Sequence, residues 1–325
     1  MPPTNFHGGD FCDTERLELV IKNIKPVVIF DLVSPQNFKH DLATYMFVNV
    51  EARRRLLDCA QRAPSVKAYV FTSSAGVLHD SRSDLHHGND SLPVLYLPEQ
   101  KEPYSHSKAV AETMVLKANG AYPGNSGRGR GMLTAAVRIV STFGEGHPMT
   151  TVPVVENAKA GKYKFQVGDG KNMSDWLYVE NAARAHLLVA QALLRAHANP
   201  SKVSEDMRVD GQAFLITNDD PVPFWHFVRS LGAAAGYPTP AEDIRVIPQW
   251  AGMTMAFVAE WITWLTTLGR TSGNFTRSGI RYSCINRYFD IDKAKQRLGY
   301  RPTVSMEEGM RRATASYRDD IKKDE

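Results

Sequence analysis

Two residues of one segment have the types and spacing needed for acid–base chemistry. Tyr104 and Lys108 stand four positions apart in PYSHSKAVAE, a spacing that places both side chains on one face of a helix. A phenol titrates near 10, and bringing its pKa to about 7 requires roughly 4 kcal/mol of preference for the phenolate. An ammonium about 5 Å away supplies on the order of 3 kcal/mol at an effective dielectric constant near 20. The spacing therefore favours a tyrosine base supported by a lysine, although Y-x-x-x-K alone is a weak motif.

The residues before this pair strengthen the interpretation. KAYVFTSSAGV (67–77) is a continuous apolar run, typical of a strand that is buried on both faces. Ser73 and Ser74 lie at its end, and ligands bind at the carboxyl edge of a parallel sheet. A serine hydroxyl at this position could hydrogen-bond the reacting oxygen. We therefore expect the serines, the tyrosine and the lysine to form one site.

The elements that must position these residues alternate along the chain. Apolar runs predict buried strands at 25–34, 67–77 and 133–140, and amphipathic stretches predict helices at 48–63, 105–118 and 176–196. This alternation favours an α/β fold with a doubly wound parallel sheet, Rossmann-like, and a small C-terminal substrate-binding α/β region. We expect residues 1–145 to form the dinucleotide-binding domain, with 165–190 returning to it, and 146–325 to form mainly the substrate-binding region.

Composition excludes several classes of protein. The 325 residues carry a net charge of +4, and because the basic residues are scattered, we expect no nucleic acid partner. Cys12, Cys59 and Cys284 show no metal-ligand spacing, so no metal is expected. The first residues lack a secretory signal. We therefore expect a protein that is not secreted and is either cytoplasmic or peripheral on a membrane.

One apolar stretch allows three interpretations. Residues 250–268 are long enough to cross a bilayer, but Glu260 lies in the middle, where an acid costs about 3 kcal/mol. Apolar side chains recur every three to four positions, as in a helix that packs on the core. A helix that lies on a membrane surface or lines an apolar substrate site is the second alternative, and a membrane span is the third.

Together these motifs resemble one family, the extended short-chain dehydrogenases, and within it the 3β-hydroxysteroid and sterol-4-carboxylate 3-dehydrogenase branch. The resemblance covers nearly the whole chain. It departs from the family pattern at Asp31, where a histidine is usual, and at Ala52 and Arg53, which replace a Gly-Thr pair. The stretches that carry it are KPVVIFDLVSP (25–35), FVNVEARRRLLDCA (47–60), VFTSSAGV (70–77), PYSHSK (103–108), AAVRIVSTFGEG (135–146), FQVGDGKNMSDWLYVENAARAHLL (165–188) and YFDIDKAKQRLGYRPTVSMEEGM (288–310).

The resemblance implies roles for individual residues. Tyr104 would be the general base, Lys108 would lower its pKa and hold the nicotinamide ribose, and Ser74 would bind the substrate oxygen. Asn49 would support the water network of the lysine. The expected cofactor is NAD or NADP, with NAD slightly favoured. Besides Tyr104 and Lys108, the residues expected to contact it are Asp10, Phe11, Leu32, Val33, Ser34, Ser73, Ile139 and Val140.

The activity implied is NAD(P)-dependent oxidation of the 3β-hydroxyl of a steroid or triterpenoid of the 4-carboxysterol type, followed by decarboxylation. The apolar 250–268 stretch suits such a hydrophobic substrate, and this activity would place the chain on the endoplasmic reticulum membrane. Two alternatives stay open: a dehydrogenase of a specialised-metabolite pathway, and a non-catalytic sensor or scaffold. Family members often pair through two helices, which here would be 36–62 and 104–119, so a homodimer is expected.

The N-terminal part of the chain lacks a motif that the resemblance leads us to expect. No G-x-x-G-x-x-G precedes residue 25, although a dinucleotide site needs a glycine-rich turn where the pyrophosphate meets a helix. If NFHGGDF (5–11) is the third strand of the family's sheet, the N-terminal glycine-rich βαβ segment is absent. We weigh two explanations: a functional protein that is longer, or a short chain with an impaired cofactor site.

Overall fold

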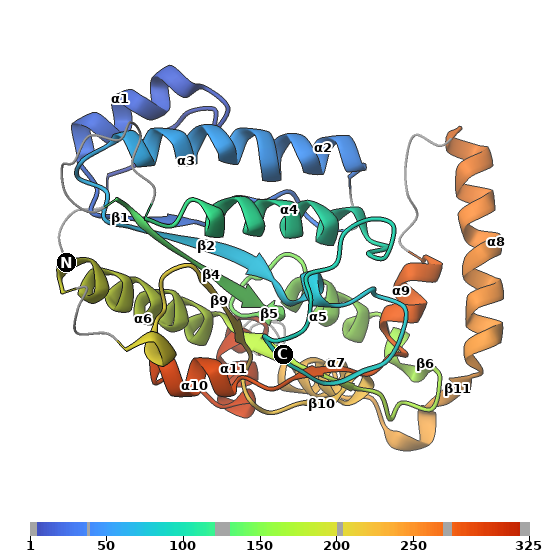
Figure 1. The fold of residues 1–325 in the computed structure, drawn as a ribbon. Helices are drawn as coiled ribbons and strands as arrows, with labels where there is room; N and C mark the ends of the chain where they lie inside the picture. Colours follow the sequence, from blue (N-terminus) through green and yellow to red (C-terminus); the bar gives the residue numbers. More distant parts are fainter. Residues whose placement is uncertain (1–4, 38–39, 121–130, 200–203, 269–274, 319–325) are drawn as a thin grey trace.

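A four-stranded parallel sheet forms the centre of the chain. The computed structural model describes residues 5–37, 40–120, 131–199, 204–268 and 275–318. The strands lie in the order β1-β2-β4-β9, each parallel to its neighbours (Figure 1). Their bounds are β1 (Val28–Asp31), β2 (Ala68–Ser74), β4 (Leu133–Ile139) and β9 (Gln212–Ile216). The predicted α/β fold with a parallel sheet is confirmed.

Helices cover both faces of this sheet, because successive side chains of each strand point to opposite sides. Tyr69 and Phe71 of β2 belong to one apolar cluster, and Ala68 and Val70 to another. The first face is covered by α1 (Thr14–Ile24), α2 (Leu42–Met46), the π-helix η1 (Phe47–Ala52), α3 (Arg53–Arg62) and α4 (Pro103–Lys117). The second face is covered by α6 (Val179–Ala198) and α10 (Asp292–Leu298).

A third apolar cluster lies beyond the carboxyl ends of the strands. Its centre is the stack of Trp176 on Phe227, whose ring centroids lie 3.6 Å apart. The helices around it are α5 (Thr151–Lys159), α7 (Phe224–Ala234) and α11 (Met306–Ala313). The short strands are β3 (Leu85–Gly88), β5 (Ser141–Phe143), β6 (Phe165–Val167), β7 (Met173–Ser174), β8 (Trp176–Tyr178), β10 (Val222–Pro223), β11 (Arg245–Ile247) and β12 (Arg287–Phe289).

Three predicted elements differ from the structure. The strand expected within 25–34 is β1, the outer strand of the described sheet, so Phe30 is exposed and the prediction of burial on both faces is wrong. Residues 5–10 are irregular, so the strand expected at 5–11 does not form. The helix expected from residue 176 begins at Val179, because the preceding three residues form β8.

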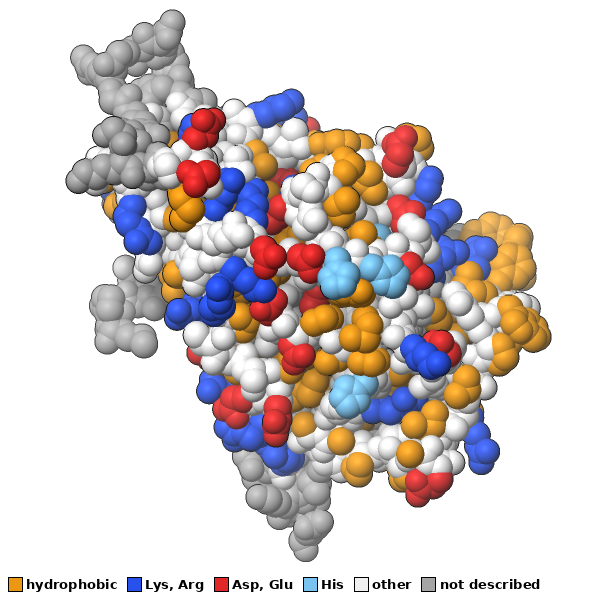
Figure 2. All heavy atoms as spheres, turned by 60° about the horizontal axis from the view of Figure 1, so that its bottom comes forward, with side chains coloured by type: hydrophobic (Ala, Val, Ile, Leu, Met, Phe, Trp, Pro, Cys, Tyr) orange, Lys and Arg blue, Asp and Glu red, His pale blue; other side chains and the backbone are white. Residues whose placement is uncertain are grey.

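The apolar stretch at 250–268 forms α8 (Gln249–Thr267), which stands apart from the central sheet beside α9 (Arg277–Tyr282) (Figure 1). Within α8 only Gly252 and Ala256 are buried, and Ala256 belongs to the apolar cluster around Trp176, so the interpretation as a helix packed on the core holds for this short stretch and is wrong for the rest of the helix. Trp261 and Trp264 are each about half exposed, and Figure 2 shows large hydrophobic side chains at this edge of the molecule. Among the described helices, none is long and apolar enough to cross a membrane.

Candidate active site

Helix α4 brings Tyr104 and Lys108 to the carboxyl end of β2. Pro103 occupies its first turn, where a fixed φ suits a helix and no N–H is needed. Lys108 is buried, and its Nζ donates a hydrogen bond of 2.8 Å to the carbonyl oxygen of Thr72. Tyr104 lies one turn earlier and is half-buried. The predicted placement of both side chains on one helical face beside this strand is therefore confirmed.

Burial shifts the protonation of both residues. The pKa of Lys108 is lowered to about 7, mainly by desolvation and in addition by the neighbouring charge of Arg53. Desolvation also raises the pKa of Tyr104 to about 12, although hydrogen bonding to Ser34 lowers it. Burial therefore opposes the lowering of the Tyr104 pKa towards 7 that the spacing of the pair favours, and the contribution of Lys108 stays a prediction.

Asn49 connects the end of β1 to α4. Its side chain is fully buried, accepts a 3.0 Å hydrogen bond from the hydroxyl of Ser34 and donates one of 2.9 Å to Ser107. Ser107 in turn donates to the carbonyl oxygen of Tyr104 at 2.7 Å. These contacts hold Ser34 and Tyr104 in one network. Asn49 lies in the π-helix, a conformation that is frequent at functional sites.

The two serines at the end of β2 face different surroundings. Ser74 is half-buried and its Oγ accepts a 3.1 Å hydrogen bond from the N–H of Gly76. Ser73 is buried and donates a 2.5 Å hydrogen bond to Glu112. The preference for Ser74 as the substrate-binding serine agrees with this placement. Ser73 was expected to contact a cofactor, but its hydroxyl is directed into the interior.

Three positions around the site were not predicted. A Cβ on Gly76 would lie 2.7 Å from Oγ of Ser105 and 3.3 Å from that of Ser74, so only glycine leaves both hydroxyls in place. Thr72, which anchors Lys108, is held through its hydroxyl by Nε2 of His186 at 2.7 Å. Only the glycine had a signal in the sequence, since it stands two positions after the predicted serine.

The other predicted cofactor residues fall into two groups. Leu32 and Val33 are exposed after β1, next to Ser34, while Ile139 and Val140 are half-buried at the end of β4. The ends of β1 and β4 lie on either side of β2, and with Tyr104 and Ser74 they provide apolar and hydroxyl groups that fit the nicotinamide end of a dinucleotide. Among the described residues we find no set of His, Cys, Asp or Glu that could hold a metal.

Asp10 and Phe11 lie before α1. Asp10 accepts a 2.8 Å hydrogen bond from the N–H of Cys12, and Phe11 packs against the cluster that includes Leu57. The predicted adenine contact of these two residues stays a prediction. The glycine-rich turn that would meet a pyrophosphate is not found within this sequence. The residues present therefore fit one end of the cofactor.

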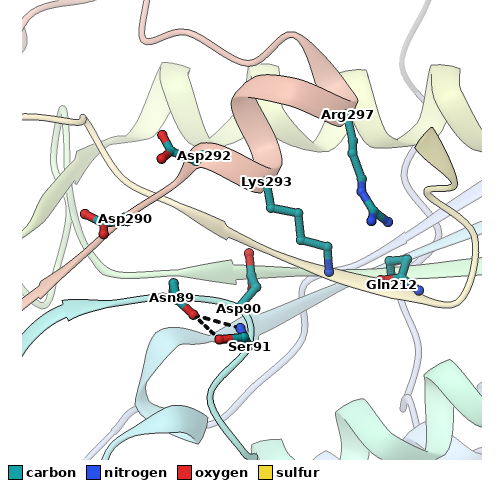
Figure 3. Close-up of a pocket in the computed structure, with 8 residues that line it drawn as sticks. All are labelled: Asn89, Asp90, Ser91, Gln212, Asp290, Asp292, Lys293 and Arg297. Carbon is teal, nitrogen blue, oxygen red and sulfur yellow. Dashed lines mark hydrogen bonds between the residues drawn. The ribbon is translucent and has the colours of Figure 1, made fainter. Parts of the chain in front are cut away.

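A polar cavity of about 420 Å³ lies elsewhere, beside β9 (Figure 3). Its lining is Asn89, Asp90, Ser91, Gln212, Asp290, Asp292, Lys293 and Arg297. Lys293 and Arg297 donate to the backbone carbonyls of Ala213 and Arg208, and Asp90 is paired with Arg138. Because these polar groups already bond to the protein, we place the candidate active site at the strand ends and not in this cavity.

Comparisons with known proteins identify the family of the chain. The family model described as "3-beta hydroxysteroid dehydrogenase/isomerase family" matches residues 2–246. The chain is 36% identical over 311 residues to a sterol-4-alpha-carboxylate 3-dehydrogenase, decarboxylating, of Schizosaccharomyces pombe, covering 95% of this chain and 83% of that protein. It is 33% identical to the protein of the same name from Saccharomyces cerevisiae, covering 95% and 82%.

Solved structures agree on the fold. A UDP-glucose 4-epimerase from Thermotoga maritima superposes with a TM-score of 0.66 at 17% identity, covering 97% of this chain and 85% of that chain. A dTDP-glucose 4,6-dehydratase from Bacillus anthracis gives 0.62 at 19% identity, covering 97% and 79%. Because of its match to the family model and its identity to the two yeast proteins, the chain belongs to the 3-beta hydroxysteroid dehydrogenase/isomerase family.

Proposed function

We propose that this chain oxidises the 3β-hydroxyl of a 4-carboxysterol with NAD or NADP, and that the product then loses carbon dioxide. One observation carries the proposal: α4 places Tyr104 and Lys108 beside the end of β2, where Ser74 lies half-buried. A family match over most of the chain and the names of the two yeast relatives support this substrate class.

The residues of the chain divide the chemistry between them. Ser74 holds the substrate oxygen by its hydroxyl, and Tyr104 accepts the hydroxyl proton. When bound, an oxidised nicotinamide dinucleotide supplies the hydride acceptor and a positive ring charge. The resulting 3-ketone of a 4-carboxysterol is a β-keto acid, which can lose carbon dioxide without further help from the protein.

The protonation of Tyr104 sets the energetic demand of this step. Its pKa of about 12 lies about five units above neutral pH, which corresponds to about 7 kcal/mol for forming the phenolate. The hydrogen bond to Ser34 and the charge of Arg53 already act in the favourable direction. We therefore expect turnover to rise with pH across the neutral range, until the base is deprotonated.

The test is turnover by the full chain. The purified protein is mixed with a 4α-carboxysterol and either NAD⁺ or NADP⁺, and nucleotide reduction at 340 nm and carbon dioxide release are measured together. The variant Tyr104→Phe should lose at least a hundred-fold in kcat. The control Tyr96→Phe removes a hydroxyl that is bonded to Thr113 of α4, and it should retain activity.

Each result of this test has a defined meaning. The faster nucleotide identifies the preferred cofactor. Turnover of 3β-alcohols without a 4-carboxylate and none with it would favour a specialised-metabolite dehydrogenase. A folded protein that binds neither NADH nor NADPH, measured by energy transfer from its five tryptophans, would refute the enzyme and favour a sensor or scaffold.

We also infer that α8 rests on a lipid surface, which would place the protein at the endoplasmic reticulum membrane, where sterols are made. Its exposed aromatic and aliphatic side chains include Trp261, Ile262 and Leu265, a composition that suits the interface between headgroups and acyl chains. Co-sedimentation with phosphatidylcholine vesicles should fall several-fold in the variant Trp261→Ser/Leu265→Ser. The variant Phe6→Ser, which changes an exposed aromatic of the N-terminal segment, should bind as the parent does.

A homodimer through helices 36–62 and 104–119 remains our proposal for the quaternary structure. It is supported by the packing of α2 and α3 alongside α4 on one side of the sheet. Light scattering coupled to gel filtration should give twice the chain mass of 36.2 kDa. The variant Arg54→Glu, which reverses an exposed charge on α3, should shift the protein towards monomer if this face is the interface.

A further inference from the structure

Arg53 is a fully buried arginine at the start of α3, and it is bonded to protein atoms on several sides. Its Nε and Nη2 form a two-point ion pair with the carboxylate of Asp31, at 2.5 and 3.1 Å. Nη2 also donates to the carbonyl oxygen of Val33 at 2.5 Å, and Nη1 donates to that of Asn49. This side chain therefore ties the end of β1 to the π-helix.

Burial of such a pair requires full satisfaction of its hydrogen bonds, because an isolated buried charge is strongly destabilising. Asp31 meets this condition, since it also accepts a 2.6 Å hydrogen bond from the hydroxyl of Tyr69. An arginine–carboxylate pair with two parallel bonds fixes orientation as well as distance. The position of the guanidinium is therefore closely determined.

The two backbone groups that Arg53 holds belong to the catalytic network. Val33 precedes Ser34, and Asn49 accepts the hydrogen bond of the Ser34 hydroxyl. Ser34 is the residue whose hydrogen bond lowers the pKa of Tyr104. A shift of the Arg53 guanidinium would therefore move both the Ser34 hydroxyl and the Asn49 side-chain amide that accepts its hydrogen bond.

Arg53 also lies beside Lys108. The ring of Phe71 holds both cations, with the guanidinium carbon 4.6 Å and the lysine Nζ 4.8 Å from the ring centroid. Two cations on one aromatic ring inside the protein repel each other, so the arginine, which is always charged, opposes protonation of the lysine.

We propose that Arg53 is a positioning residue for the reaction: it fixes the Ser34–Asn49 pair beside Tyr104, and its charge controls the protonation of Lys108. This inference rests on the proposed function for its catalytic meaning. Other groups also face Tyr104 and Lys108 from the elements packed around them. These are Tyr45 of α2 beside Tyr104, and Asp31 of β1 and Glu112 of α4 near Lys108. Asp31 is in turn bonded to Tyr69 of β2, and Glu112 to Arg138 of β4.

The first test follows the lysine directly and requires no turnover. In protein labelled with ¹³C at lysine Cε, the Lys108 resonance is identified by its loss in Lys108→Arg, and its midpoint is titrated. Arg53→Met should move the midpoint upward by about one pH unit or more, and Asp31→Asn should move it downward. The control Arg54→Met removes an exposed neighbouring arginine and should leave it unchanged.

The second test distinguishes the effect of the Arg53 charge from the effect of its hydrogen bonds to the carbonyl oxygens of Val33 and Asn49. Arg53→Lys keeps the charge but cannot bond both carbonyls, so the Lys108 midpoint should stay within about half a unit. Turnover should fall ten-fold or more in kcat, with a small change in KM. Equal kcat in Arg53→Lys and the parent would overturn the positioning role, and an unchanged Lys108 midpoint in folded Arg53→Met would overturn the charge effect.

A second pair of variants serves if Arg53→Met is unstable. If Arg53→Met does not fold, the double variant Asp31→Asn/Arg53→Gln, which replaces both charges of the pair, is compared with Asp31→Asn. A higher Lys108 midpoint in the double variant than in Asp31→Asn supports the inference, and equal midpoints refute it. Absence of sterol oxidation in the parent would refute the proposed function, whereas the titration of Lys108 would still report on Arg53.

Discussion

Replacing Arg138 with methionine removes a guanidinium that lies between two buried carboxylates. Arg138 makes hydrogen bonds of 3.2, 3.1 and 2.6 Å to Glu112 and one of 3.0 Å to Asp90. All three side chains are at least nine-tenths buried. After the replacement, Glu112 keeps the hydroxyl of Ser73 and Asp90 keeps the N–H of Leu215, but neither retains this ion-pair partner.

The expected loss of stability follows from the two carboxylates that no longer have Arg138 as a partner. Breaking a buried ion pair by removing one partner destabilises a protein by about 3–5 kcal/mol. This corresponds to roughly a hundred-fold to several thousand-fold in the unfolding constant. The bond from Ser73 to Glu112 adjoins the end of β2, so we also expect the loss to reach Ser74 and reduce turnover.

Urea unfolding at pH 7, followed by tryptophan fluorescence, measures this cost. The control Arg184→Met removes an exposed arginine on α6 and should change the free energy of unfolding by less than about 0.5 kcal/mol. The triple variant Asp90→Asn/Glu112→Gln/Arg138→Met removes all three charges and should recover much of the loss. A loss below about 1 kcal/mol in Arg138→Met would refute the assignment of this cluster as a paired charge network.

Two further predictions concern pH and close packing. Burial raises the pKa of Asp175 to about 7, so between about pH 4 and pH 7 the folded chain holds a proton that the unfolded chain releases, and stability falls as pH rises through this window. Urea midpoints at pH 5 and pH 8 should show this fall in the parent and a smaller one in Asp175→Asn, and equal slopes would contradict the prediction. Gly76→Ala places a methyl group 2.7 Å from Oγ of Ser105 and 3.3 Å from that of Ser74. Its kcat should drop ten-fold or more while its melting temperature changes by a few degrees, and unchanged kcat would show that Ser74 is not used.

Much of the fold could be predicted because the buried strands are continuous apolar runs. Residues 67–77 and 133–140 contain β2 and β4, and 105–118 contains most of α4. The same pattern led to the error at 25–34, since an apolar run does not indicate whether another strand lies on each side. Hydrophobicity alone cannot separate a central strand from an outer one.

The helix at 250–268 illustrates a second limit. Its apolar residues recur at helical spacing, which predicts a helix but not its partner. In the structure they surround α8 on several sides, and most remain exposed. A stripe that packs on a core and an apolar surface that awaits a lipid or a substrate can have the same spacing, so the distinction needed the tertiary structure.

The candidate site shows why side-chain protonation is harder to predict than side-chain placement. Spacing places Tyr104 and Lys108 on one face, and that placement depends only on the helix. The pKa of each depends on everything that surrounds it, including residues distant in sequence such as Arg53 and Ser34. Neither the burial of the lysine nor the arginine beside it has a signal in the Y-x-x-x-K motif.

Asp31 and Arg53 join these observations. Each departs from the family pattern. Asp31 is a charged residue in an apolar run, and Arg53 is a charged residue at the start of a helix. In the structure they are 22 positions apart in sequence and form a buried two-point pair. A change at one position alone would leave a buried charge, which costs several kcal/mol, so the two departures are physically coupled. Because Arg53 also donates to the carbonyl oxygens of Val33 and Asn49, the pair supports the Ser34–Asn49 contact beside Tyr104, the proposed base.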